Sequence, residues 1–107
     1  MANERVDHFL REWLNAVRKY EEADREVQRI MASYLAQVDA GLPLDKLSGR
    51  RHHHELSFVE ADRLARQDPR RKDAVSARTL FAERATMYGI SALVEILRER
   101  NNRRDSP

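Results

Sequence analysis

The first forty residues carry one apolar stripe with the spacing of a helix that packs along its whole length. Apolar residues recur at alternating intervals of four and three, and the one interruption is Asp24. This spacing places the side chains on one side of a helix, as in helices that pack lengthwise against other helices. The stripe consists of Val6, Leu10, Trp13, Val17, Tyr20, Val27, Met31, Tyr34 and Val38. It predicts a helix over residues 3–40, roughly 55 Å long at 1.5 Å per residue.

Both ends of this first helix have recognisable signals. Asn3 is a good N-cap, and Glu4 carries negative charge in the first turn, where the helix dipole favours it. Gly41 is suited to the position just after the last turn, and Pro43 cannot continue a helix. Further apolar residues widen the stripe: Phe9, Leu14, Ala16, Ala23, Ile30 and Leu35. A face this broad favours a multi-helix bundle over a two-stranded coiled coil.

Residues 41–56 form the predicted connector, which contains two of the three glycines and one proline. After it, Ser57 and Glu60 have the spacing of a capping box, which predicts a second helix over 57–67. Sixteen residues is long for a connection within a bundle. The connector is therefore expected either to pack through its leucines or to have a role of its own.

Asp68 followed by Pro69 reads as an N-cap followed by the first residue of a new helix. We therefore expect a third helix over residues 69–100, with one long kinked helix as the alternative. The remaining residues, 101–107, are polar and are expected to fray. The fold class predicted for the whole chain, residues 1–107, is an all-α single domain. It would be an up-down helical bundle completed by self-association.

The last predicted helix carries a row of small residues, which would let another helix approach closely. The row consists of Ala82, Ala85, Gly89 and Ala92, followed by Ile96. Between Met87 and Leu97 nearly the whole circumference is apolar, as in helices that are buried on several sides. A second copy of the chain is the simplest cover in so short a protein. We therefore predict a homodimer or higher oligomer whose interface contains Trp13, Val17, Tyr20, Ala82, Ala85, Gly89 and Ala92.

Two charged residues interrupt the apolar patterns. Asp24 occupies a stripe position in the first helix, and Arg84 interrupts the flank of the stripe in the last helix. A half-buried pair between Asp24 and Arg84 would fix the register of the helices. The alternative is that the helices separate at this level and that both groups are hydrated.

Composition excludes several classes of protein. The chain has no cysteine, so disulfides and cysteine-based catalysis or zinc binding are excluded. It has neither a membrane-length apolar segment nor an apolar run near its N-terminus, so we expect a cytoplasmic protein without membrane contact. No Gly-rich phosphate loop or nucleophile arrangement is present, and we predict no catalytic residues, no cofactor and no enzymatic activity.

Three consecutive histidines, His52–His54, are the strongest candidates for metal chemistry. On a helix their side chains would point about 100° apart, and no spacing typical of a zinc site accompanies them. We therefore predict a solvated connector and no metal site.

Arginine accounts for 17 of the 20 basic residues, and the positive excess lies in the second half of the chain. Clusters that would suit phosphate contacts are Arg50, Arg51, Arg70, Arg71, Lys72, Arg98 and Arg100. Acidic residues are interleaved with them, and no aromatic residues stand among them to stack on bases. The predicted function is that of a small regulatory adaptor that acts through an unidentified protein partner. The alternative is a nucleic-acid-associated accessory protein.

Overall fold

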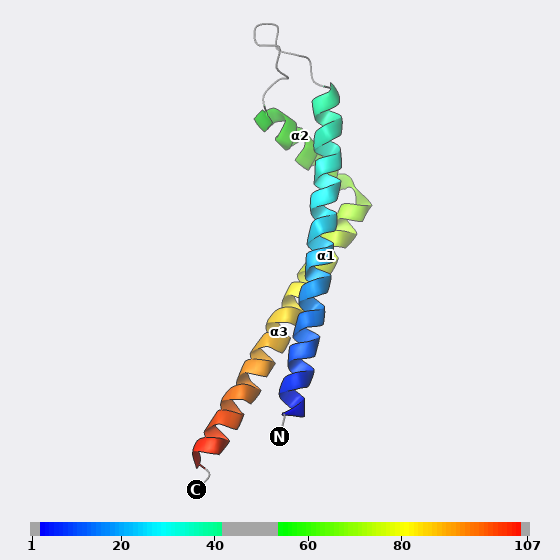
Figure 1. The fold of residues 1–107 in the computed structure, drawn as a ribbon. Coiled ribbons are helices and arrows are strands. Elements are labelled where there is room, and N and C mark those ends of the chain that lie inside the picture. The colour runs from blue at the N-terminus through cyan, green and yellow to red at the C-terminus, as the bar shows by residue number, and fades with distance from the viewer. Residues whose placement is uncertain (1–2, 42–53, 106–107) are drawn as a thin grey trace. The chain divides into compact units, whose positions relative to one another are not determined.

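The computed structural model describes residues 3–41 and 54–105, and these residues form three α-helices (Figure 1). Helix α1 spans Glu4–Gly41, α2 spans His54–Gln67 and α3 spans Pro69–Asp105. Within the described residues, Asn3 and Asp68 alone lie outside a helix, and there is no strand. The all-α class is confirmed.

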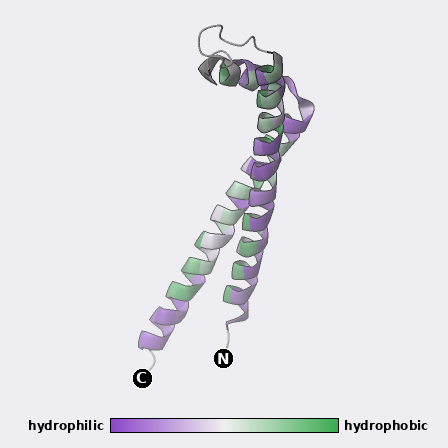
Figure 2. Ribbon diagram, turned by 45° about the horizontal axis from the view of Figure 1, so that its top comes forward, coloured by the Kyte–Doolittle hydropathy of each residue, from purple (hydrophilic) through white to green (hydrophobic). Residues whose placement is uncertain are grey.

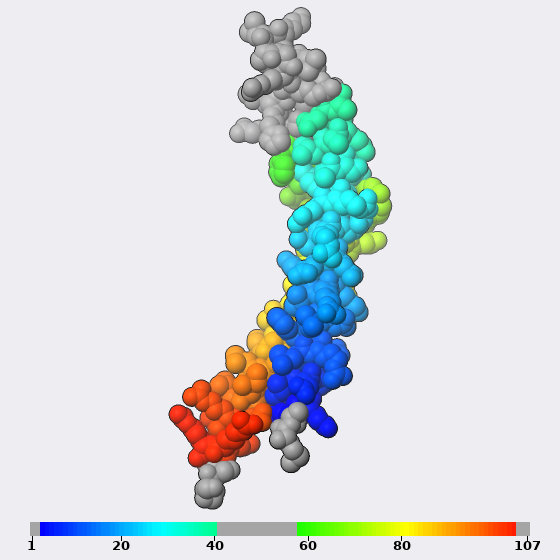
Figure 3. Space-filling model, in the orientation of Figure 1, coloured from blue at the N-terminus to red at the C-terminus, as the bar shows by residue number. Residues whose placement is uncertain are grey.

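The chain divides into two compact units. The terminal unit consists of Met1–Glu22 and Ala77–Pro107, and the middle unit consists of Ala23–Ser76. In the terminal unit, the first part of α1 and the last part of α3 lie side by side (Figure 3). They run antiparallel, because Asn3 contacts Glu99 while Lys19, farther along α1, lies over the ring of Phe81.

Asn3 caps α1 as the sequence predicts. Its side-chain oxygen accepts hydrogen bonds from the backbone N–H groups of Arg5 at 3.0 Å and Val6 at 3.3 Å, and its carbonyl accepts from Asp7. These contacts satisfy donors that have no partner inside the helix. The Asn3 amide group also donates to Glu99 at 3.3 Å, so the cap is joined to α3.

The start of α2 differs from the prediction. The helix begins at His54 and not after Ser57, so Ser57 lies inside α2 and the N-cap role predicted for it was wrong. Glu60, expected to reach back to Ser57, instead accepts hydrogen bonds from Arg63 one turn later. The favourable helix formers Glu55 and Leu56 precede Ser57, which explains why no break is required there.

The end of α3 also differs from the prediction. The helix continues to Asp105 and includes residues 101–105, which were expected to fray. Glu99 accepts a hydrogen bond from Arg103 at 2.8 Å across one turn, and Arg103 and Arg104 stand in the last turn. Such pairs, and basic residues beside the negative end of the helix dipole, both stabilise a helix end.

Asp68 separates α2 from α3, in agreement with the predicted break. Its carboxylate accepts from the backbone N–H of Arg70 at 2.8 Å, and its carbonyl accepts from Arg71 and Lys72. The side chain of Arg70 and the hydroxyl of Tyr34, on α1, both donate to the same carboxylate at 2.7 Å. The Asp68 side chain is buried, and each of its oxygens has a partner.

The core of the middle unit forms around this junction. Among the side chains of this unit that the structure describes, the buried apolar ones are Val27, Ile30, Ala61, Ala65 and Ala74. Alanines on α2 and α3 therefore pack against larger residues of α1, which allows the helices to approach closely.

The hydrogen bond and ion pair with Arg70, together with the hydrogen bond from Tyr34, hold the pKa of Asp68 well below its usual range. The folded state therefore favours the ionised carboxylate, which stabilises the protein above about pH 4 and ceases to do so as the pH falls. We expect Asp68→Asn, which keeps the capping oxygen, to lose less stability than the unmodified protein between about pH 5 and pH 2. Urea unfolding across this range measures the difference. Parallel pH profiles for the two proteins would contradict the expectation.

Candidate protein interaction surface

The contact between Trp13 and Gly89 joins the two helices of the terminal unit. A Cβ atom added at Gly89 would lie 3.2 Å from Cδ1 and 3.3 Å from Nε1 of the indole ring. These distances are shorter than ordinary van der Waals contacts, so a larger residue at position 89 would require the indole ring to move by a few tenths of an ångström. The close approach also explains why a glycine stands inside a helix, where it costs roughly 1 kcal/mol relative to alanine.

The residues of the predicted oligomer interface lie near one another within one chain, and their role in an oligomer stays a prediction. Gly89 faces Trp13, Ala92 is buried, and Val17, Tyr20, Ala82 and Ala85 line one shallow hollow of about 220 Å³. The small-residue row of α3 therefore accommodates α1 of the same molecule. Trp13 still leaves 39% of its surface exposed, so the row does not cover it completely.

The two sides of this helix pair differ in chemistry. Val17 and Ala82 line the apolar hollow. Asn15 and Arg84 line a polar hollow. Each of them lies two residues from Val17 or Ala82 on the same helix, which places it about 160° around that helix. On the polar side, Lys19 and Arg84 lie 5.4 and 5.6 Å from the centre of the Phe81 ring. This side of the helix pair carries its own cation–π contacts.

Ion pairs add to the polar side of α3. Glu95 is buried and accepts from Arg98 at 3.2 Å, and Arg5 of α1 lies 3.9 Å from the same carboxylate oxygen. Both arginines are exposed, so these pairs contribute little stability but keep the charges matched.

Much of the apolar surface of the terminal unit is exposed. Among the residues that the structure describes in the terminal unit, the buried apolar ones are Ala16 and Ala92. Ten large apolar side chains of the same described residues are exposed by 39 to 57%. We call them the apolar face: Leu10, Trp13, Leu14, Leu80, Met87, Ile90, Leu93, Val94, Ile96 and Leu97. Hydrophobic residues follow both helices of this unit in Figure 2.

A second stripe, which the sequence analysis did not identify, follows α3 and contains five residues of the apolar face. We call it the outward stripe, and it consists of Leu80, Glu83, Met87, Ile90, Val94 and Leu97. Its intervals alternate between three and four, so it has the spacing of a helix-packing seam. Ile90 and Val94 each stand two residues from buried Ala92, which places the stripe on the side of α3 away from α1. A search for heptads at every starting residue would have found it.

The register pair stays a prediction. The carboxylate of Asp24, in the middle unit, accepts a hydrogen bond from Gln28 at 2.8 Å, and Arg84, in the terminal unit, lies over Phe81. Each of these two side chains therefore has a contact on its own helix.

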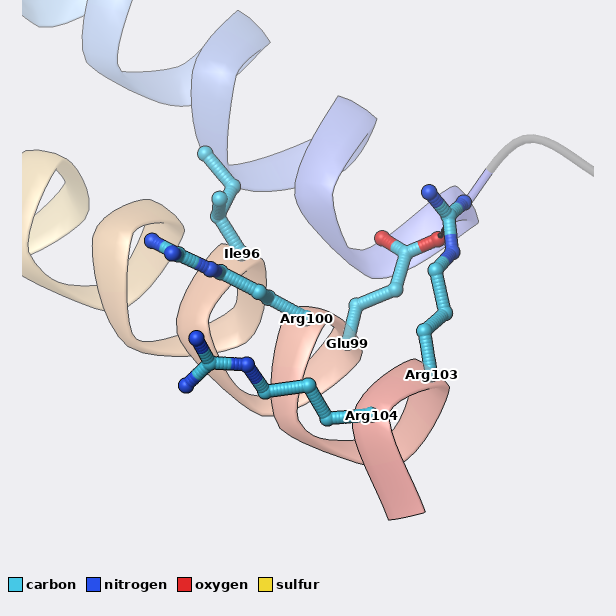
Figure 4. A pocket seen from close by; sticks show the side chains of 5 residues that line it. All are labelled: Ile96, Glu99, Arg100, Arg103 and Arg104. Atoms are coloured by element: carbon cyan, nitrogen blue, oxygen red, sulfur yellow. Dashed lines mark hydrogen bonds and ion pairs between the residues drawn. The ribbon is translucent and has the colours of Figure 1, made fainter. Parts of the chain in front are cut away.

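The residues of the predicted basic clusters have different surroundings in the structure. Arg70 and Arg98 form ion pairs with Asp68 and Glu95. Arg71 lines a groove of the middle unit, and Arg100 lines a hollow at the end of α3 together with Arg103 and Arg104 (Figure 4). Lys72 is exposed, and Arg50 and Arg51 lie outside the described residues.

The histidine prediction also falls largely outside the described part of the chain. His52 and His53 are not described, and of His54 the backbone alone is described. Among the described side chains, no group of three or more His, Asp or Glu residues is placed to hold a metal ion. No described helix contains a stretch long and apolar enough to cross a membrane.

The middle unit has a groove of about 390 Å³ between α1, α2 and the start of α3. Val27, Met31, Leu35 and Phe58 supply its apolar walls, and Phe58 is 51% exposed. Gln28, Asp62 and Arg71 supply polar groups at its margin. Apolar walls with a few polar groups are typical of sites that bind a ligand or a peptide segment.

Comparison of the chain with protein-family models, with curated proteins and with solved structures found no match.

The close contact at Gly89 predicts energetic coupling with Trp13. We expect Gly89→Ala to raise the free energy of unfolding by about 1 kcal/mol in a Trp13→Ala background, because alanine is the better helix former. With Trp13 present the gain should be smaller, because the indole must move. Urea unfolding of the four proteins of this cycle, at one protein concentration, measures the coupling. Equal gains in both backgrounds would show that the contact has no energetic weight.

Proposed function

We propose that the protein is a small non-enzymatic helical adaptor that acts through protein–protein contacts. The observation that carries the proposal is the exposure of large apolar side chains in both units. Contiguous apolar surface of this extent on a small protein is typical of interaction sites, because monomers rarely leave so much of it in water. The apolar face would serve self-association, and the groove of the middle unit would receive a second protein.

The most perturbed ionisable groups support a role without catalysis. The pKa of Asp68 is lowered and that of Arg70 is raised because the two groups hydrogen-bond to each other. The hydrogen bond to Asp68 raises the pKa of Tyr34. Strongly shifted groups often mark active sites. Here all three belong to the cap that starts α3, so the shifts have a structural explanation.

The groove fits an apolar helix or extended segment better than a charged ligand. Met31 and Phe58 present flexible and flat apolar surfaces, which adapt to partners of different shape. Asp62 and Arg71 at the margin would orient a partner that carries charges of both signs.

We expect Phe58→Asp to abolish the capture of a host protein that the unmodified chain retains after nuclease treatment. The matched control is Val59→Asp, which adds the same charge to the neighbouring residue of α2, 64% exposed and outside the groove lining. An affinity pull-down from the native host followed by mass spectrometry compares the three proteins. Loss of the captured protein with both variants, or with neither, would contradict docking in this groove.

A second candidate, nucleic-acid association, has one observation in its favour. Arg100, Arg103 and Arg104 gather around a hollow of about 370 Å³ at the end of α3, and Arg100 and Arg104 are exposed (Figure 4). Such a cluster suits phosphate groups. Arg103 is paired with Glu99, which lowers the net charge of the hollow.

For this second candidate we expect duplex DNA or RNA to bind with an affinity that falls steeply with salt. The double variant Arg100→Gln with Arg104→Gln should reduce the slope of log affinity against log salt by about 2, because each arginine neutralises about one phosphate. The control pair, Arg11→Gln with Arg18→Gln on exposed positions of α1, should leave the slope unchanged. Fluorescence anisotropy at several salt concentrations measures it, and binding that is absent or independent of these residues would exclude the candidate.

A further inference from the structure

We propose that a second copy of this chain packs on the outward stripe of α3, with the two α3 helices antiparallel and related by a two-fold axis. The proposal rests on the self-association included in the proposed function and specifies its surface and orientation. The stripe lies on the side of α3 away from α1. The two α3 helices would therefore lie side by side at the centre of the dimer, and α1 of each copy would lie outside them.

The apolar area of the outward stripe fits a dimer interface of standard size. Its five apolar residues are exposed by 39 to 57%, and at roughly 150–200 Å² of accessible surface each they leave on the order of 400 Å² in water. Two copies together would therefore bury on the order of 800 Å² of apolar surface. Standard interfaces bury about 1,200–2,000 Å² in total, of which roughly 60% is apolar.

Within the terminal unit of one copy, the described apolar residues that are buried are smaller than those that remain exposed to water. In the described part of the terminal unit, Ala16 and Ala92 are buried, whereas Ile90, Leu93 and Met87 are each more than half exposed. The residues with the largest hydrophobic contribution thus lie outside the contact of α1 with α3. A copy packed on the outward stripe would bury Met87 and Ile90.

The charges at the two ends of the outward stripe favour a second copy in one orientation. Glu83 is the one acidic residue of the stripe, and it lies near the start of the stripe. Arg100 and Arg104 follow the other end and are exposed. If Ile90 faces Val94 of the other copy, Met87 faces Leu97 and Glu83 falls between Arg100 and Arg104. A parallel pair would place Glu83 against Glu83, which repels.

This complementarity is a property of the chain with itself. A two-fold interface requires that one surface match a copy of itself rotated by 180°. The outward stripe meets this requirement, because its apolar centre and its oppositely charged ends exchange places under that rotation.

The first experiment measures the mass of the full chain by sedimentation equilibrium between about 1 and 100 µM. We expect a dimer for the unmodified chain and an increase of at least about 100-fold in its dissociation constant for Ile90→Asp. The matched control, Asn15→Asp, adds a carboxylate to the polar side and should dimerise as before. Circular dichroism checks that both variants remain helical. A monomer at all concentrations, or a dimer that Ile90→Asp leaves intact, would overturn the proposal.

Charge reversal tests the orientation. Glu83→Arg should weaken the dimer about tenfold, and adding Arg100→Glu and Arg104→Glu to the same chain should restore it to within about threefold. In a parallel dimer the second pair of changes brings no recovery, and that result would overturn the antiparallel arrangement.

Cross-linking gives an independent measurement that does not depend on a charged substitution in the interface. The chain has no cysteine, so an introduced thiol is the one reactive thiol. A mixture of Ile90→Cys and Val94→Cys chains should form disulfide-linked dimers faster than either chain alone, because these positions face each other across the axis. Faster linking of either chain with itself would overturn the register.

The outcomes also separate this inference from the proposed adaptor function. A monomeric chain that still captures a host protein through Phe58 would end the dimer proposal and leave the adaptor role standing. A dimer that captures no host protein would support the dimer proposal and contradict the adaptor role.

Discussion

The close approach of α1 and α3 at Trp13 and Gly89 determines which apolar residues of the terminal unit are buried and which are exposed. Helices that approach this closely have room for small side chains between them, so the apolar residues buried in the described part of this unit are alanines. The larger apolar residues of the same two helices must then lie outside the contact. The apolar face is thus a direct consequence of the small-residue seam. Exposed apolar area is unfavourable in water, and this is the physical basis of the proposed association.

In the middle unit, small residues again lie between the helices, but larger apolar residues are buried with them. Ala61, Ala65 and Ala74 bring α2 and α3 close to α1, and Val27 and Ile30 fill the space between them. The buried carboxylate of Asp68 fixes the point where α2 ends and α3 begins, because it caps α3 and also accepts hydrogen bonds from Tyr34 and Arg70. The groove beside this core is bounded by α1, α2 and the start of α3, so its shape depends on that junction.

The sequence predicted helix starts correctly where one residue has a dominant capping role. Asn3 and Asp68 cap helices as the sequence predicts, and the helical spacing of α1 is correct over its length. Prediction failed at Ser57, where a capping pattern lies inside a helix, and in the last turn of α3, where pairing of Glu99 with Arg103 extends the helix. In both places neighbouring residues favour helix by amounts comparable to the local stop signal, so the signal alone does not decide.

The site was harder to predict than the helices. The sequence identifies Trp13, Gly89 and the alanine row as contact residues, but it does not say whether they meet within a chain or between chains. In the structure Trp13 contacts Gly89 of the same chain, and Ile90 of the outward stripe and the nearby Leu93 are among the most exposed apolar residues of the terminal unit. The sequence by itself determined the helices and their apolar residues, because spacing and capping act between neighbours in the chain. The tertiary structure alone decided which apolar side is buried, because α3 is apolar on nearly all sides and burial depends on where α1 lies.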